Sequence, residues 1–85
     1  MKIKYTASYN RGFGKLCPEL QELVLLKIER FTEYSFHMGL KAHKLHGRMA
    51  DSWAFSINHK YRIVYKFIGE DTAYLLEIGT HDIYD

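Results

Sequence analysis

The alternation of apolar and polar side chains at the start of the chain predicts a strand. Ile3, Tyr5 and Ala7 are separated by polar residues, which is the period of a half-buried strand, and we expect the strand to end near Ala7. A short helix capped by Ser8 should follow, although Gly12 and Gly14 each weaken it by about 1 kcal/mol. The apolar positions of this helix are Tyr9, Phe13 and Leu16.

A longer helix is predicted from Pro18 to Tyr34. Proline is favoured in the first turn of a helix, and the nearby acidic Glu19 suits the positive end of the helix dipole. Leu25 and Leu26 widen the apolar stripe of this helix, so we expect the helix to be well buried. The stripe itself consists of Leu20, Leu23, Val24, Ile28, Phe31 and Tyr34.

The periodicity fails between Ser35 and Asp51, which indicates a long connection, and it then returns as three strands. The strands are expected around 52–58, 61–67 and 72–78, with turns near Asn58 and Gly69. Together they should form an antiparallel meander with the helices packed on one face and the other face left for a partner. The expected fold class is α+β, in a single domain spanning residues 1–85.

Composition excludes several classes of protein. Hydrophobic residues make up 47% of the chain and there is one proline, which is typical of a folded domain and not of a disordered one. We expect no membrane segment, and the polar start lacks the apolar centre of a signal peptide, so the expected location is the cytoplasm. The one cysteine, Cys17, cannot form an internal disulfide, and we expect it to fill the core.

Charge is unevenly distributed along the chain. Residues 36–69 contain six basic residues against the single acidic Asp51, a net charge of +5, whereas the remainder has six basic and nine acidic residues, a net charge of −3. Four of the five histidines also lie in this basic segment, which favours an anionic partner such as nucleic acid. A solvated surface whose charges happen to cluster is the alternative.

Motifs for other chemistry are incomplete. Gly12 and Gly14 form a glycine pair without the spacing of a nucleotide-binding loop. His43 and His46 would need further ligands to hold a metal, and no Ser-His-Asp or Cys-His arrangement marks a nucleophile. We therefore expect neither a metal nor a cofactor.

A cationic surface rich in imidazoles is suited to cleavage of RNA without a metal. The 2′-hydroxyl must lose a proton as it attacks the adjacent phosphate, and the leaving 5′-oxygen must gain one, and histidine can do both. Arginine can hold the phosphate at two points, and lysines supply attraction over a longer range.

Four segments of the chain carry a resemblance to a known family. They are 41–48 (KAHKLHGR), 52–57 (SWAFSI), 60–66 (KYRIVYK) and 76–82 (LEIGTHD). Together they resemble the RelE/ParE toxin superfamily, especially its RelE- and YafQ-like members that cleave messenger RNA. The match spans essentially the whole chain, since Cys17-Pro18-Glu19-Leu20 also resembles the start of the family's second helix.

The resemblance implies the RelE-like microbial ribonuclease fold and a bacterial toxin of a type II toxin-antitoxin system. Such a toxin is neutralised by a cognate antitoxin, binds the ribosome and cuts messenger RNA, an mRNA interferase that inhibits translation. By position, His43 and His81 match histidines of the YafQ-like site, Arg62 matches a phosphate-contacting arginine, and Tyr84 resembles the C-terminal aromatic residue. The expected RNA-binding residues are Lys41, Lys44, Arg48, Lys60, Tyr61 and Lys66, with His46 and His59 as additional candidates that have no clear family counterpart.

Two departures from the family pattern leave alternatives open. Ser56 stands where the YafQ-like branch has a histidine, and Lys60 stands where it has an aspartate. The chain is therefore also compatible with a ParE-like inhibitor of DNA gyrase that does no chemistry, or with an inactive relative that binds only its antitoxin. For Tyr61, sheet packing is favoured over base stacking, and Arg62 can be a simple exposed charge.

Overall fold

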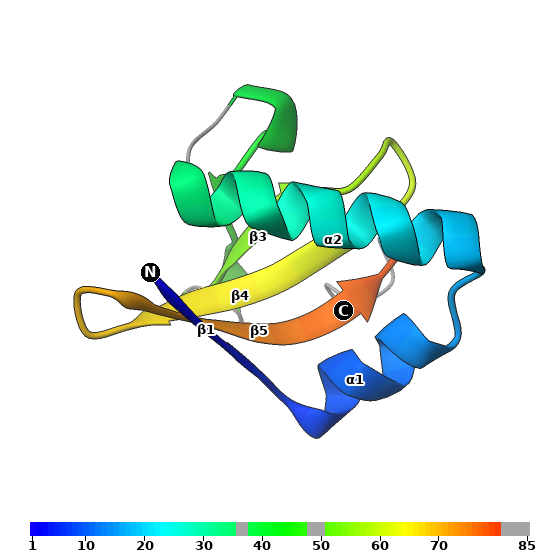
Figure 1. Cartoon of the computed structure of the whole chain (residues 1–85). Helices are drawn as coiled ribbons and strands as arrows, with labels where there is room; N and C mark the ends of the chain where they lie inside the picture. The colour runs from blue at the N-terminus through cyan, green and yellow to red at the C-terminus, as the bar shows by residue number, and fades with distance from the viewer. Residues whose placement is uncertain (36–37, 48–50, 81–85) are drawn as a thin grey trace.

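Five strands form one mixed sheet in the computed structural model, which describes residues 1–35, 38–47 and 51–80 (Figure 1). The strand order is β1-β5-β4-β3-β2, with β1 parallel to β5 and the other neighbours antiparallel. The elements along the chain are β1 (Lys2–Tyr5), α1 (Ala7–Gly14), α2 (Pro18–Glu33), the 3-10 turn η1 (Met38–Leu40), β2 (His43–Lys44), β3 (Trp53–Ser56), β4 (Arg62–Ile68) and β5 (Thr72–Gly79).

The α+β class and the antiparallel meander of β3, β4 and β5 are confirmed. The long connection expected between Ser35 and Asp51 contains two elements that the sequence did not predict, η1 and the short strand β2. His43 and Lys44 of β2 pair with Ala54 and Trp53 of β3, which adds a fifth strand to the sheet. A two-residue strand with both side chains exposed has no alternation that a sequence pattern can reveal.

The first turn of the chain differs from the expectation in its cap. β1 ends at Tyr5, and the N-cap of α1 is Thr6, whose Oγ1 accepts a hydrogen bond from the backbone N of Tyr9 at 2.9 Å. The same hydroxyl donates to the carbonyl oxygen of Leu76 at 2.6 Å, so it ties α1 to β5. Ser8 is not the cap, because its hydroxyl donates instead to the carboxylate of Glu77 at 2.5 Å.

Gly12 allows α1 to approach β5 closely. A Cβ at this position would lie 2.9 Å from both Cγ2 and the carbonyl oxygen of Ile78, a separation that real Cβ atoms do not adopt. The glycine that the sequence presents as a weakness of the helix is therefore the residue that lets the helix pack.

Helix α2 covers one face of the sheet (Figure 1) and buries Val24, Ile28 and Phe31. The expectation that Leu25 and Leu26 widen its buried stripe is wrong, since these side chains are 56% and 43% exposed. They follow the buried Val24 on the helix and lie outside the arc that faces the sheet. Cys17 was also expected in the core, and it is exposed at the N-cap of α2.

The centre of the core is a group of aromatic rings. The ring of Tyr65 lies 4.7 Å from that of Phe31 in an edge-on arrangement and 5.5 Å from those of Phe55 and Phe67. The hydroxyl oxygen of Tyr65 is buried and has no hydrogen-bond partner among the residues that the structure describes. Burial raises the pKa of Tyr65 to about 12, and burial together with the neighbouring Tyr5 raises the pKa of Tyr9 as well.

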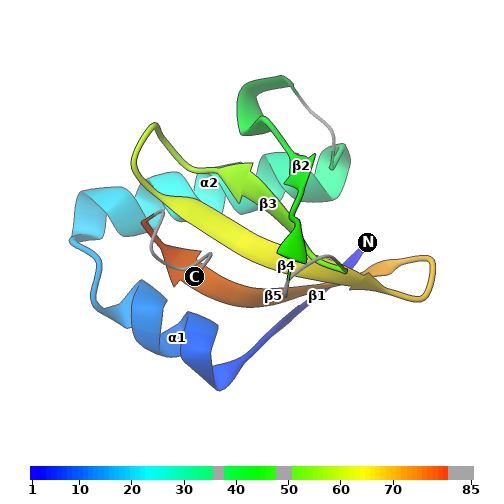
Figure 2. The ribbon, with the colours of Figure 1, turned by 180° about the vertical axis from the view of Figure 1, so that it is seen from behind.

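Figure 2 views the molecule from behind and shows the face of the sheet opposite α2. This face was expected to be left for a partner, but it carries a second apolar cluster of Leu45, Ala54 and Val64, all buried. Register places Ser56 of β3 beside Arg62 of β4 on this same face, because successive side chains of a strand alternate between faces. Ser56 and Arg62 therefore lie side by side at one end of this face.

Candidate functional site

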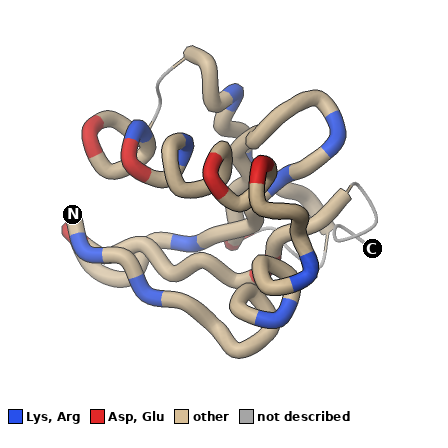
Figure 3. Tube along the Cα trace, turned by 45° about the vertical axis from the view of Figure 1, so that its right-hand side comes forward, with Lys and Arg blue, Asp and Glu red and all other residues tan. Residues whose placement is uncertain are grey.

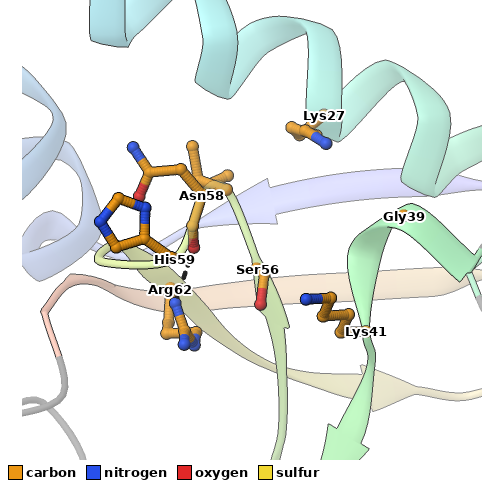
Figure 4. Close-up of a pocket in the computed structure, with 8 residues that line it drawn as sticks. Lys27, Gly39, Lys41, Ser56, Asn58, His59 and Arg62 are labelled. Atoms are coloured by element: carbon orange, nitrogen blue, oxygen red, sulfur yellow. Dashed lines mark hydrogen bonds between the residues drawn. The ribbon is translucent and has the colours of Figure 1, made fainter.

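A pocket of about 220 Å³ lies at the edge of β3, where β2 no longer covers it (Figure 4). It brings together residues from α2, from the segment before β2 and from the turn between β3 and β4. The lining consists of Lys27, Gly39, Lys41, Ser56, Ile57, Asn58, His59 and Arg62. We call it the cationic pocket, since three of these residues carry a fixed positive charge.

Lys41 is placed at the pocket by the register of β2 and by an unusual backbone conformation. β2 pairs with β3 only as far as His43 opposite Ala54, and continuing this antiparallel register brings Lys41 level with Ser56. Lys41 has a φ of +51°, a left-handed conformation that costs a non-glycine residue about 1 kcal/mol. Leu40 is fully buried and anchors the segment to the core, which holds Lys41 in this conformation.

The turn between β3 and β4 orients Arg62. The side-chain oxygen of Asn58 accepts hydrogen bonds from the backbone N of Lys60 at 2.9 Å and of Tyr61 at 2.8 Å, which closes the turn. The carbonyl oxygen of Asn58 in turn accepts from Nη1 of Arg62 at 2.8 Å (Figure 4). The carbonyl oxygen of Tyr61 accepts from the same Nη1 at 3.2 Å. The guanidinium is thus fixed by the backbone of the turn that lines the pocket.

Lys27 comes from α2 and was not among the candidates from sequence. It is half-buried, and Figure 4 shows it on the helix above the pocket. A signal was present, because Lys27 follows the buried Val24 by three residues and precedes the buried Phe31 by four, so it lies on the arc of α2 that faces the sheet. A cation at such a position must reach out along the apolar surface to the edge of the sheet.

The electrostatic character of the pocket is uniformly positive. Its described lining carries Lys27, Lys41 and Arg62, with His59 beside them, and no lining residue is acidic. Figure 3 shows several acidic residues on the trace of α2, whereas the described part of the basic segment 36–69 contains only Asp51. Like charges gathered without a compensating carboxylate repel one another and favour an anionic ligand.

His43 lies next to the pocket on the same face as Ser56. It is opposite Ala54, which is two residues before Ser56 on β3, a separation of about 7 Å along the strand. Its Nδ1 lies 3.3 Å from the carbonyl oxygen of Lys41. The tautomer that carries its proton on Nδ1 can donate to this oxygen, and in that tautomer Nε2 is the basic atom of the neutral ring.

Several predicted RNA-binding residues lie away from the pocket. Lys44 is opposite Trp53 on the other side of β2 from His43, and Lys66 is opposite Tyr74 at the far end of β4. The Nζ of Lys60 lies 5.8 Å from the centre of the Tyr61 ring, and that ring packs partly against the core.

Of the two additional histidines, His59 lines the pocket, whereas His46 is exposed outside its lining. Of the predicted residues that the structure describes, Lys41, His59 and Arg62 line the pocket, with His43 adjacent. His81, Tyr84 and Arg48 lie outside the described residues, so their proposed roles stay predictions.

In residues 1–35, 38–47 and 51–80, His, Cys, Asp and Glu side chains form no group of three or more able to hold a metal ion. Over the same ranges, none of the helices combines the length and apolarity needed to cross a membrane. A second hollow of about 180 Å³ lies between α1, β1 and α2 and is lined by Tyr5, Tyr9, Asn10, Phe13 and Leu25. Its largely apolar lining distinguishes it from the cationic pocket.

The sequence matches no family model and no curated protein. The structure is similar to a YoeB/ParE toxin from Agrobacterium tumefaciens, with a TM-score of 0.82 and 22% identity over 95% of this chain and 99% of that chain. It is also similar to YafQ from E. coli strain BL21(DE3), with a TM-score of 0.72 and 13% identity over 96% and 94% of the two chains.

A third similar structure is the toxin-antitoxin complex RelBE2 from Mycobacterium tuberculosis, where the TM-score is 0.65 and the identity 19% over 94% of this chain and 96% of that chain. At these identities the likeness concerns the fold. The fold expected from the four sequence segments is therefore confirmed.

Proposed function

We propose that this protein, which has the fold of RelE/ParE-type toxins, is the toxin of a bacterial toxin-antitoxin pair and an endoribonuclease that cuts messenger RNA on the ribosome. The observation that carries the proposal is the convergence of Lys41 and Arg62, two residues flagged by the sequence, with Lys27 and His59 at one cationic pocket. A surface that only packs against a protein has no special need of this combination of cations and imidazoles.

Phosphate binding falls to Arg62 in this proposal. Its Nη1 is held by two backbone carbonyl oxygens, so the planar guanidinium is oriented before the substrate arrives. Negative charge grows on the phosphoryl oxygens as the 2′-hydroxyl attacks, and a fixed guanidinium stabilises that charge most strongly in the transition state. Ser56, on the same face, offers a hydroxyl that can donate to the phosphate but cannot act as a base near neutral pH.

Proton transfer falls to histidines. His43 is the proposed base for the 2′-hydroxyl, acting through Nε2 in the tautomer that donates from Nδ1 to the carbonyl oxygen of Lys41. His81, which the family resemblance assigns to the site, would serve as the partner that protonates the leaving 5′-oxygen, or the two would exchange roles. Both steps use side chains of the chain itself.

The antitoxin is the proposed protein partner. One similar structure is a toxin-antitoxin complex, and this chain covers 96% of the chain matched there. A second candidate function is inhibition of DNA gyrase without chemistry, which is favoured by the likeness to a protein named YoeB/ParE toxin. The imidazoles at and beside the pocket favour the ribonuclease.

The experiment that tests the proposal is single-turnover cleavage of messenger RNA on programmed ribosomes. Arg62→Lys keeps the charge and loses the two-point geometry, so we expect a fall in rate on the order of 10²-fold. Arg11→Lys, an exposed position on α1, is the matched control and should cleave at the wild-type rate. Full activity of Arg62→Lys would assign Arg62 to the exposed-charge alternative.

A further inference from the structure

We propose that Lys27 and Lys41 form a second phosphate subsite beside Arg62, which holds the RNA phosphate next to the one that is cut. The inference rests on the proposed ribonuclease function and adds to it a positioning residue, Lys27, that comes from α2 and not from the basic segment of the sequence. Its ligand is a backbone phosphate of single-stranded RNA, bound without regard to the base.

The first support is the number and arrangement of cations. Arg62 is tied to the turn at Asn58, whereas Lys27 and Lys41 reach the pocket from α2 and from the segment before β2 (Figure 4). A single phosphate bound by Arg62 leaves the positive charges of Lys27 and Lys41 without a negative partner, since the described lining holds no carboxylate. A second phosphate of the same strand supplies the missing negative charge.

The second support is the backbone at Lys41. A left-handed conformation at a non-glycine residue persists only where the surrounding structure maintains it, and such residues cluster at sites of function. Here Leu40 is fully buried on one side and β2 pairs with β3 on the other, so the side chain of Lys41 is directed to the edge of β3 at Ser56. Figure 4 shows Lys41 projecting toward Ser56.

The third support is the chemistry and size of the pocket. An ammonium group is a point charge that binds phosphate oxygens without fixed geometry, which suits a subsite that positions a strand and does not catalyse. A volume of about 220 Å³ is below the roughly 300–1,000 Å³ of pockets for drug-sized ligands. It suits a short stretch of sugar-phosphate backbone and not a whole nucleotide cofactor.

The test compares Lys27→Gln and Lys41→Asn with the control Lys4→Gln. Asparagine tolerates the left-handed backbone of Lys41 while removing its charge. Lys4 is an exposed lysine on β1, at the opposite edge of the sheet from the pocket. The probe is a fluorescent single-stranded DNA oligonucleotide, which cannot be cleaved by attack of a 2′-hydroxyl.

The measured quantity is the slope of log affinity against log salt. We expect Lys27→Gln and Lys41→Asn each to reduce the slope by about 0.7, the value for one lost phosphate contact on a single strand. Lys4→Gln should leave the slope unchanged, and Lys27→Arg should restore it. Slopes equal to that of Lys4→Gln for both pocket variants would overturn the subsite.

Cleavage on programmed ribosomes separates the subsite from the ribonuclease function. Lys27→Gln should raise KM at least about threefold and keep kcat within about twofold of wild type, because the residue binds the strand without acting on the reacting atoms. A fall in kcat with unchanged KM would refute a positioning role. A wild-type protein that does not cut, together with reduced slopes in the pocket variants, would refute the ribonuclease function and uphold the phosphate subsite.

Discussion

Replacing Tyr65 by phenylalanine should stabilise the protein. The change removes one oxygen atom and keeps the ring that contacts Phe31, Phe55 and Phe67. That oxygen is buried and has no hydrogen-bond partner within residues 1–35, 38–47 and 51–80, and an unsatisfied buried polar group costs about 1–3 kcal/mol. Because the space left by one oxygen offsets part of the gain, we expect Tyr65→Phe to raise the free energy of unfolding by about 1 kcal/mol at pH 7.

The advantage of Tyr65→Phe should grow in alkaline solution. The pKa of Tyr65 is 10.0 when unperturbed and about 12 in the folded chain, where burial disfavours the phenolate. Above pH 10 the unfolded chain therefore loses this proton more readily than the folded chain, so wild-type stability falls as the pH rises from 10 to 12 and is fully retained below 10. At pH 11 this loss amounts to about 1.4 kcal/mol, and the phenylalanine variant escapes it.

Urea unfolding at pH 7, 9 and 11 measures both effects. The matched control is Tyr34→Phe, whose side chain is 62% exposed, and it should lie within about 0.5 kcal/mol of wild type at pH 7. A less stable Tyr65→Phe at pH 7 would mean that the hydroxyl makes a favourable interaction. A gap between variant and wild type that stays constant up to pH 11 would refute the raised pKa of Tyr65.

The remaining predictions concern α1, the turn and the catalytic histidine. Gly12→Ala should lower the free energy of unfolding by about 1–3 kcal/mol, because its Cβ meets Ile78 and this clash outweighs the better helix propensity of alanine. Gly14→Ala has open space around it and should be neutral or stabilising in the same urea assay. Asn58→Ala should destabilise the protein by about 1 kcal/mol in thermal melts and slow cleavage, since the side-chain hydrogen bonds that close the turn beside Arg62 are lost. Unchanged stability and cleavage would contradict this role of Asn58. His81→Ala should reduce single-turnover cleavage on the order of 10²–10⁴-fold while ribosome binding changes little, and equal rates would remove it from the mechanism.

Elements with a sustained hydrophobic period were predictable from sequence. The long helix was expected from Pro18 to Tyr34 and is found from Pro18 to Glu33, because Pro18 marks its start and a helical stripe of apolar residues defines its length. The three final strands were likewise expected, since their apolar positions alternate and a glycine at Gly69 adopts the positive φ of the turn between β4 and β5.

Features that depend on contacts between distant segments were not predictable. Thr6 and Ser8 are both chemically suited to cap α1, and the choice is made by Leu76 and Glu77, which engage the two hydroxyls from β5. Composition gave no hint of Gly12 as a packing residue either, because the carbonyl group it must clear belongs to a strand at the other end of the chain.

Only part of the candidate site could be predicted from the sequence, because the rest also depends on contacts between distant segments. Lys41 stood out because it lies in a locally basic segment, and Arg62 because the family resemblance also marks it. Register then brings Lys41 level with Ser56, which lies opposite Arg62. Lys27 sits among acidic and apolar residues of α2, so local charge does not mark it, and only the packing of α2 on the sheet places it at the pocket. Lys44 and Lys66 show the converse, since basic residues of the same segment are directed away from the pocket.

The most direct test of the proposed function compares translation with supercoiling. Added to a translating extract, the wild-type protein should produce messenger RNA fragments cut within coding sequence, and Arg62→Lys should produce far fewer. In a purified gyrase assay the wild-type protein should leave DNA supercoiling unaffected. Intact messages in the extract together with blocked supercoiling would contradict the ribonuclease account and identify a gyrase inhibitor instead.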